Sequence, residues 1–451
     1  GSIGSKVITF LMLPLYTKWL NPSDYGISDL ISTYAFIFVP LISFCISEAI
    51  FVYPKNRIKK IQSSFFTTGF TFVATIFLIV FLLIYFLKDY VAYDNIIFDY
   101  IWFIYLISLF SFLSTFLQQF SRAIDMIKVY ASAGIVQVIT VTILSFTLIP
   151  KYGLIGMLYG QIISIVVVCL FLIFKTKAFT FFNIKLFSKK RLSIILRYSI
   201  PLVPNSLMFI LIAYTNRPII ENYLGVDSLG ILAIAEKFSG ILLMFVSIFM
   251  YAWQISAIEE YKNKGYEKFY NIVLRSGFMI ILLVSLIISF FSFYLIKHTI
   301  NEEFLSSWKY IPVLLFSPPL VYISSIVGVN FLVTKQTKYF FKSTVIGGIG
   351  AVVFNIILIP NYGLFGACVS IGFSQFLIMI SRIYYSRKIV IIANQYKYIY
   401  SYFLLIFISF RVINFEYDII NICYFILCIL ILLYINRDIF LSIKKNLKIH
   451  V

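Results

Sequence analysis

Of the 451 residues, 61% are hydrophobic and only 12% are charged, and the mean hydropathy is +0.97. A soluble globular protein carries roughly twice this charged fraction, so the composition excludes that class and indicates an integral membrane protein. Apolar runs of about twenty residues favour membrane helices over the short alternating segments of a β-barrel. The net charge of +19 could suit nucleic acid, but its distribution along the chain points elsewhere.

Taken in chain order, the apolar runs predict an all-α polytopic membrane protein with about 14 transmembrane helices. The expected spans are residues 1–20, 29–53, 62–87, 100–120, 128–149, 153–174, 198–220, 229–256, 272–296, 308–333, 339–359, 363–384, 398–412 and 419–437. The chain starts without a methionine inside the first expected span, which indicates a trimmed N-terminus, and no signal peptide is recognised.

Basic residues gather in every second connection and in the C-terminal tail. These segments hold most of the 37 Lys and Arg, and the other connections hold most of the acids. Basic loops stay on the cytoplasmic side of a membrane, so the alternation predicts that both termini are cytoplasmic. Topology and contact with anionic membrane lipids then account for the positive charge, and no nucleic-acid partner is expected.

One short stretch occurs twice. Residues 148–164 read LIPKYGLIGMLYGQIIS and residues 358–374 read LIPNYGLFGACVSIGFS, 210 positions further on. Each copy lies between two apolar runs, so we expect proline to stop the first helix and glycine to permit a tight hairpin. A second pair, residues 19–26 and 223–230, matches at an offset of 204. The chain therefore contains two copies of one unit.

The repeat predicts two pseudo-symmetric six-helix bundles and two extra C-terminal helices. The expected divisions are an N-terminal lobe at 1–174, a basic cytoplasmic linker at 175–197, a C-terminal lobe at 198–386, and two additional helices with a cytoplasmic tail at 387–451. The last two helices have no counterpart in the repeat and are interpreted as an appendage.

Several kinds of chemistry have no support in the sequence. There is no phosphate-binding G-x-x-x-x-G-K-[ST] loop, and His298 and His450 are poor material for a metal site. No outer loop is long enough to form a catalytic domain. We therefore expect a non-enzyme with no cofactor and no metal site.

Among the ionisable residues within the expected spans, five are singled out: Lys6, Glu48, Arg217, Glu236 and Lys237. Each costs roughly 2.5–3.5 kcal/mol at the centre of a membrane helix, so each needs a reason. Lys6 and Glu48 come to similar depth on adjacent helices, and so do Arg217 and Lys237.

Two interpretations of these charges remain open. In the first, Lys6 pairs with Glu48 and Arg217 with Glu236, and the pairs only neutralise each other. In the second, Arg217, Lys237 and Lys6 line a water-filled cationic cavity between the lobes that binds an anionic head group. Glu48 and Glu236 would then be charge partners or ion-coupling residues.

The segments that carry these charges resemble a known family. SKVITFLMLPLYTKWLNPSDYG at 5–26, the two LIPxYGLxG hairpins, and NRPIIENYLGVDSLG at 216–230 followed by AIAEK at 233–237 are similar to the polysaccharide-transporter branch of the multidrug/oligosaccharidyl-lipid/polysaccharide (MOP) exporter superfamily. That branch contains the Wzx-type flippases for O-antigen and capsule. The family often has Asp before the arginine, where this chain has Asn216, which would remove a partner for Arg217.

The resemblance implies a V-shaped pair of MATE/MOP-like bundles that works by alternating access in a bacterial inner (plasma) membrane. The implied cargo is an undecaprenyl-diphosphate-linked oligosaccharide, such as an O-antigen, capsule or exopolysaccharide unit, moved from the inner to the outer leaflet. Other polysaccharide-assembly proteins are implied partners. Lys6 falls where related lipid II flippases carry a cavity arginine.

Two other functions remain open. A cation-coupled multidrug or toxin extruder of the same superfamily would use Glu48 or Glu236 as its ion site. Fourteen spans and excess positive charge favour the flippase over such an extruder. A membrane polysaccharide polymerase or ligase is a weaker alternative, because it would need a sizeable outer loop with reactive bases.

Overall fold

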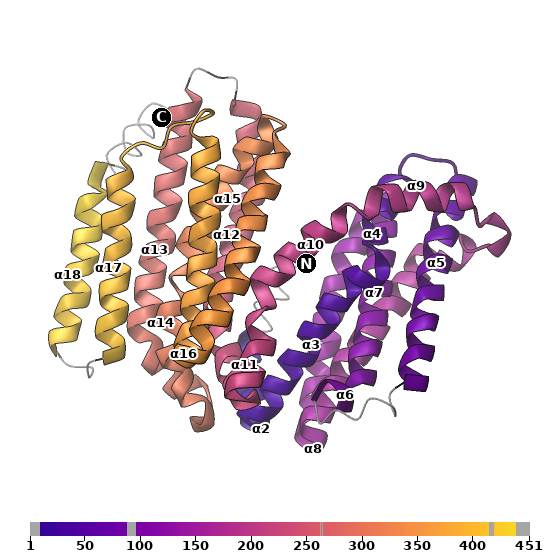
Figure 1. Ribbon diagram of the computed structural model, residues 1–451, viewed down its shortest axis with the longest axis horizontal. Coiled ribbons are helices and arrows are strands. Elements are labelled where there is room, and N and C mark those ends of the chain that lie inside the picture. The colour runs from indigo at the N-terminus through magenta and orange to yellow at the C-terminus, as the bar shows by residue number, and fades with distance from the viewer. Residues whose placement is uncertain (1–9, 88–95, 262, 264, 415–418, 439–451) are drawn as a thin grey trace. The chain divides into compact units, whose positions relative to one another are not determined.

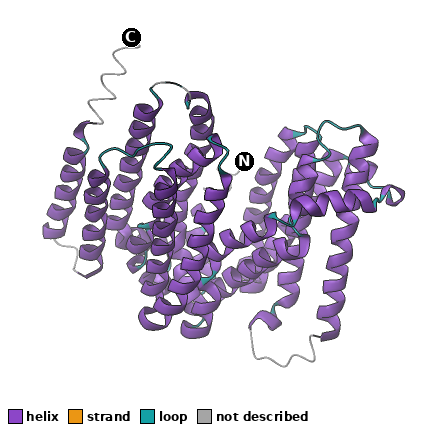
Figure 2. Ribbon diagram, turned by 45° about the horizontal axis from the view of Figure 1, so that its top comes forward, coloured by secondary structure: helices purple, strands orange, loops and turns teal. Residues whose placement is uncertain are grey.

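In the computed structural model, every regular element among the described residues is a helix (Figure 2). The structure describes residues 10–87, 96–261, 263, 265–414 and 419–438. Contacts divide the chain into two units, Gly1–Ile210 and Leu211–Val451, and the division falls inside one helix. The predicted all-helical membrane fold is confirmed.

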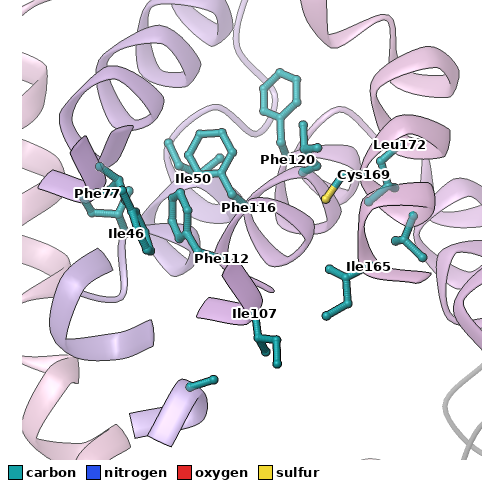
Figure 3. Close-up of a cluster of buried hydrophobic side chains, with 14 of the residues drawn as sticks. Ile46, Ile50, Phe77, Ile107, Phe112, Phe116, Phe120, Ile165, Cys169 and Leu172 are labelled. Carbon is teal, nitrogen blue, oxygen red and sulfur yellow. The ribbon is translucent and has the colours of Figure 1, made fainter. Parts of the chain in front are cut away.

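Unit 1 surrounds a core rich in aromatic side chains. Phe112, Phe116 and Phe120 on one helix share a buried cluster with Cys169 and Leu172 on the next (Figure 3). The elements are α2 (Leu13–Trp19), α3 (Pro22–Ser43), α4 (Ile46–Val52), α5 (Lys59–Leu87), α6 (Ile96–Asp99), α7 (Ile101–Ala123), α8 (Ile127–Thr176), the 3-10 turns η2 (Ala178–Thr180) and η3 (Ile184–Leu186), α9 (Lys189–Ser199) and most of α10 (Leu202–Tyr214).

Unit 2 includes the C-terminal helix pair in its core. Figure 1 shows α17 and α18 alongside α13, and Leu405 and Phe425 from this pair are buried in one cluster with Leu282 of α13. The elements are α11 (Asn216–Leu224), α12 (Val226–Glu260), α13 (Tyr266–Thr299), η4 (Glu302–Lys309), α14 (Ile311–Leu314), α15 (Ser317–Val333), α16 (Thr337–Ser386), α17 (Gln395–Asn414) and α18 (Ile419–Ile435). The pair lacks a counterpart in the repeat, yet it packs as part of unit 2.

The described helices account for the predicted spans. Nine of them are long and apolar enough to cross a membrane, and the bent series from α9 to α11 makes a tenth. The helices α8 and α16 each contain 50 residues and fold back on themselves, so each supplies two spans. With α8 and α16 counted twice, these helices supply twelve spans, and the shorter apolar helix α18 stands where the last of the predicted 14 is expected. Part of the first predicted span, residues 1–9, lies outside the described residues.

The repeated hairpins reverse at glycine. Gly153 and Gly363 have φ of 53° and 60°, a region that L-residues with a side chain rarely adopt. A Cβ on Gly156 would lie 2.4 Å from the Leu148 carbonyl oxygen. Both glycines of the motif are therefore required, the first for its φ and the second for close backbone approach.

The prediction that proline stops the first helix of each hairpin is wrong. Pro150 and Pro360 lie inside helical backbone, and the chain reverses three residues later. A proline removes the donor for the carbonyl four residues earlier and crowds it, which bends a helix without always ending it.

The loop before each hairpin helix also repeats. Asp125 and Lys335 both adopt a left-handed conformation, with φ of 60° and 59°. The next residue donates its N–H across the loop in both cases, over 2.8 Å from Met126 to Ser121 and 2.7 Å from Gln336 to Phe331. Corresponding positions are 210 residues apart, so the repeat holds at the level of backbone hydrogen bonds.

The second expected span differs from its prediction in two ways. It starts seven residues earlier, at Pro22, because the Asn21 side chain accepts a 2.7 Å hydrogen bond from the Asp24 N–H and caps the helix. It is also broken at Phe44 and Cys45, two consecutive left-handed residues that divide α3 from α4. No glycine marks this break, and Pro40 is the only sequence signal near it.

Candidate functional site

The polar centre of unit 2 lies at the joint between α10 and α11. Pro218 has no N–H to give the Tyr214 carbonyl, and the helix is interrupted at Thr215. Arg217 comes two residues after Thr215 and is 4% exposed. Arg217 Nη1 donates a hydrogen bond to the Ala213 carbonyl at 3.1 Å. The side chain therefore satisfies a backbone carbonyl at the end of α10.

Arg217 faces α12 and forms a two-pronged ion pair with Glu236. Nη1 donates to Glu236 Oε1 at 3.0 Å, and Nη2 donates to Oε2. The Tyr214 ring lies 5.3 Å from the guanidinium carbon. The planar guanidinium and carboxylate groups are complementary in this geometry, and because they are paired neither charge is isolated in the apolar interior. The structure thus contains one of the two pairs of the first interpretation.

The expectation that Asn216 removes a partner from Arg217 is wrong. Its side-chain oxygen accepts a 2.8 Å hydrogen bond from Arg217 Nη1. An amide oxygen accepts this hydrogen bond without carrying a charge, so Asn216 can provide the acceptor of an aspartate but cannot neutralise Arg217. Its Nδ2 is buried without a hydrogen-bond partner, which leaves one donor at this site unused.

The other predicted site residues are spread over both units. Lys237 is half-buried next to Glu236 on α12 and points about 100° away from it around the helix. Glu48 belongs to unit 1, where its exposed carboxylate accepts a 3.2 Å hydrogen bond from Gln119. Lys6 lies outside the described residues. The cationic cavity and the Lys6–Glu48 pair therefore remain predictions.

An apolar groove lies elsewhere in unit 2, along α13, α15, α16 and α17. Its volume is about 520 Å³, and Phe278, Phe376, Tyr398 and Tyr402 are among its lining residues. The Tyr402 hydroxyl donates to the Phe316 carbonyl at 2.9 Å, whereas the Tyr398 hydroxyl is buried without a partner. Because α17 forms one wall, the groove depends on the helix pair that the sequence interpreted as an appendage.

Two buried cations of unit 2 were not among the ionisable residues that the sequence singled out. Arg275 and Arg382 stand near the ends of two expected spans, beside basic connections, and they lie inside α13 and α16, where they are 7% and 5% exposed. Arg275 Nη2 donates to Asp438 at 2.8 Å, and Arg382 Nη1 donates to the Ser324 carbonyl at 2.9 Å. Loop charge alone cannot reveal this, because partners far along the chain decide which basic residues are buried.

The Arg275 contacts fasten the end of α18 to α13. Arg275 Nε also donates to Asn436 at 3.0 Å, and Lys397 donates to the same Asp438 carboxylate at 3.0 Å. Burial alone would raise the pKa of Asp438, but hydrogen bonds from Arg275 and Lys397 outweigh it and lower the pKa from 3.8 to about 2. Within the described part of the chain, no three His, Cys, Asp or Glu side chains gather as a metal site would require.

Comparison with known proteins places this arrangement in a family. The sequence model of the family described as "Polysaccharide biosynthesis protein" matches residues 1–254. No curated protein sequence matches significantly. The fold is similar to the lipid II flippase MurJ in an inward closed conformation, with a TM-score of 0.71 and 17% identity over 97% of this chain and 98% of that one.

A second solved structure has the same fold. It is an inward-facing multidrug resistance MATE family transporter of the MOP superfamily, with a TM-score of 0.66 and 14% identity over 86% of this chain and 94% of that one. At these identities the two likenesses concern the fold alone, which this chain shares with both proteins, as the resemblance implied.

Proposed function

This chain belongs to the polysaccharide biosynthesis protein family, and we propose that it is a flippase for an undecaprenyl-diphosphate-linked oligosaccharide. The cargo would be an O-antigen, capsule or exopolysaccharide unit that passes from the inner to the outer leaflet by alternating access. The fold is a transporter fold, and the proposed chemistry is binding and release without catalysis.

The apolar groove of unit 2 is the observation that carries the lipid part of this proposal. Its lining is aromatic and aliphatic over about 520 Å³, which suits a hydrocarbon chain better than a sugar. Polar groups are few in this lining, where Gln395, Tyr398 and Tyr402 lie among aromatic and aliphatic side chains. MurJ is named as a flippase of lipid II, so a polyprenyl-linked cargo is compatible with this fold.

Arg217 is the proposed contact for the diphosphate, by an exchange of partners. In the structure both of its Nη atoms are engaged with Glu236, so phosphate oxygens would have to replace that carboxylate. Arginine binds phosphate and carboxylate with the same two-pronged geometry, which makes such an exchange chemically direct. Lys237 and Lys6 would contribute further positive charge.

Transport in reconstituted vesicles tests this function. The purified chain is placed in liposomes with a fluorescent undecaprenyl-diphosphate oligosaccharide, and a membrane-impermeant quencher reports how much cargo changes leaflet. We expect protein-dependent transfer, and none for the same lipid without its diphosphate. Efflux of cationic dyes without any lipid transfer would contradict the proposal.

A matched pair of variants tests the groove. Ile399→Trp fills the groove from α17, whereas Ile420→Trp makes the same change on α18 outside it, and the two isoleucines are 56% and 57% exposed. We expect the first to slow lipid transfer at least fivefold and the second to leave the rate near that of the parent. Equal lipid-transfer rates for both variants would show that the cargo does not use the groove.

Cation-coupled drug export remains the second candidate, because the fold also matches a MATE transporter. The exposed Glu48 carboxylate is the group in unit 1 that could take a coupling cation. Drug efflux that depends on a Na⁺ or H⁺ gradient and is lost in Glu48→Gln would favour this function over the flippase.

A further inference from the structure

The segment between α8 and α10 carries exposed apolar and basic side chains together. We name as the linker surface the exposed Phe179, Phe182, Ile184, Phe187, Ile194 and Tyr198 with the exposed Lys177, Lys185, Lys189, Lys190 and Arg197. The sequence from 175 to 200 has seven basic residues and no acidic one. From this surface we propose a binding site for anionic phospholipid head groups at the cytoplasmic face of unit 1.

The backbone of the linker surface is fixed by three buried hydroxyls of α5. Thr67 Oγ1 donates to the Phe181 carbonyl at 3.2 Å and accepts from the Asn183 N–H at 3.1 Å. Ser64 Oγ donates to the Leu186 carbonyl, and Thr68 Oγ1 accepts from the Ser188 N–H at 3.1 Å. Because these hydrogen bonds hold both 3-10 turns against α5, the backbone of the segment has a defined conformation.

This anchoring decides which apolar side chains face inward. Phe181 is buried, with its ring centroid 5.0 Å from that of Phe120, and Lys59 Nζ lies over the Phe181 ring, 5.3 Å from its centroid. The flanking Phe179 and Phe182 are 61% and 43% exposed. A fixed backbone cannot turn them inward, so their burial requires a hydrocarbon environment outside the protein.

Helix α9 continues the same composition. Ile195 is fully buried and faces the protein, whereas Lys190, Ile194, Arg197 and Tyr198 lie about one turn apart on the outer side. A helix with apolar and basic groups mixed on its outer side suits the plane where acyl chains meet phosphates. The helices packed against α9 are α4 and α5. Helix α5 contains no Asp or Glu, and α4 contains one acid, Glu48, whose carboxylate accepts a hydrogen bond from Gln119. The seven basic residues of the segment therefore outnumber the acids of the helices packed against α9.

Anionic phospholipid fits this surface better than other occupants. The cytoplasmic leaflet carries negative charge, which attracts Lys and Arg side chains near its surface. Aromatic side chains at the head-group level add apolar contact that a soluble anion could not use. The proposal does not depend on the proposed cargo, because it concerns a resident lipid on unit 1.

Lipid retention measured by native mass spectrometry tests the site. The full-length protein is incubated with equal amounts of phosphatidylglycerol and phosphatidylcholine in mild detergent. The triple variant Lys185→Gln, Lys189→Gln, Lys190→Gln should retain at most half as much phosphatidylglycerol as the parent. The matched control, Lys335→Gln, Lys338→Gln, Lys342→Gln, removes the same charge from the exposed first turns of α16 and the loop before it in unit 2, and should retain as much as the parent.

Two results would overturn the proposal. One is equal phosphatidylglycerol retention by the linker variant and the parent, and the other is an equal loss in both triple variants. The parent gives an independent reading, since 0.5 M salt should release phosphatidylglycerol and leave phosphatidylcholine bound. Release of phosphatidylglycerol by undecaprenyl diphosphate from the parent alone would identify the surface as a cargo dock and also reject the resident-lipid assignment.

Discussion

The two units share a backbone plan but fill it with different chemistry. At the buried ends of α7 and α8, unit 1 places Phe120 and Leu172, and the positions 210 residues later hold Asn330 and Arg382. Asn330 donates to Ser386 Oγ at 2.9 Å, and Arg382 Nε donates to Ser343 Oγ at 3.1 Å. The hairpin glycines and left-handed loop residues are therefore what the repeat preserves, while the interior is free to be apolar or hydrogen-bonded.

The two units also differ in whether the backbone of one corresponding helix is continuous. In unit 1 it is broken at Phe44 and Cys45, whereas its counterpart at an offset of 204 lies within α12, which runs unbroken from Val226 to Glu260. A left-handed non-glycine residue costs roughly 1–2 kcal/mol, so the break is kept against a local penalty. The break between α3 and α4 is therefore a feature of unit 1 that α12 lacks.

The largest expected effect comes from the glycines that both units share. Gly366→Ala would place a methyl group 2.1 Å from the Leu358 carbonyl oxygen, and Gly156→Ala would do the same at 2.4 Å from Leu148. Because the contact is with backbone, the hairpin itself must open. We expect each variant to lose most of its folded protein, measured as the monodisperse peak in size-exclusion chromatography.

Gly240→Ala provides the control for the hairpin glycines. This glycine lies in α12 with nothing within 4 Å of an added Cβ, so alanine should raise stability by about 1 kcal/mol. Normal yield of Gly366→Ala would show that the hairpin can relax, and that the two hairpins need not share this backbone contact.

The next effect tests whether the polar centre of unit 2 is functional or only structural. Arg217→Gln and Lys237→Gln should each reduce polysaccharide export to near background at normal membrane abundance, and Arg217→Lys should retain part of it. Arginine supplies two-pronged contacts to phosphate, and lysine supplies only charge.

The double variant Arg217→Gln, Glu236→Gln separates the two interpretations. Breaking a buried pair by removing one partner costs about 3–5 kcal/mol, because the remaining charge is uncompensated. If Arg217 only neutralises Glu236, the double variant regains export. We expect stability to return without export, as judged from melting temperature and transport together.

A smaller effect concerns the C-terminal pair, which only unit 2 possesses. Arg275→Gln should lower the melting temperature by several degrees, because Asn436, Asp438 and the Ile435 carbonyl lose donors in one change. Arg197→Gln, an exposed arginine of unit 1, should change the melting temperature by less than one degree. Similar shifts for both variants would mean that the fastening of α18 is dispensable.

The ion pair between Arg275 and Asp438 should make the stability of the protein depend on pH. The pKa of Asp438 is about 2 when folded and 3.8 in the ordinary state, so its contribution is present above pH 4 and is lost as the pH falls from 4 to 2. Asp438→Asn should remove that part of the acid sensitivity. If the melting temperatures of the parent and the variant change by the same amount between pH 4 and pH 2, Asp438 is not the source of this acid sensitivity.

A truncation near Lys388 addresses the same helix pair. The sequence alone predicts that such a chain keeps some transport, since the pair lies outside the repeat. The groove wall formed by α17 changes that expectation: we now expect the truncated chain to lose lipid transfer even where it inserts. Retained transfer in a well-inserted truncation would restore the appendage interpretation.

The smallest effect tests the break between α3 and α4. Cys45→Gly should raise stability by about 1 kcal/mol, because glycine adopts a left-handed conformation without strain. Phe249→Gly, at the corresponding position of the unbroken α12, should lower stability by at least 1 kcal/mol. Losses of equal size would show that the strain at Phe44 and Cys45 is not a real difference between the units.

The sequence by itself determined the class, the number of spans and the repeat. Those follow from local signals: hydrophobic length sets a membrane helix, and a glycine with its neighbours sets a hairpin. Arg217 and Glu236 were also identified locally, because a charge in a long apolar run stands out whatever surrounds it.

The tertiary structure alone decided which groups meet. It paired Arg217 with Glu236, fastened Arg275 to Asp438 from 163 residues away, and made α17 a wall of the groove. It also placed Asn330 and Arg382 in an interior where the repeat has Phe120 and Leu172. Partner choice depends on packing between distant segments, and no periodicity or local propensity encodes the distance between them.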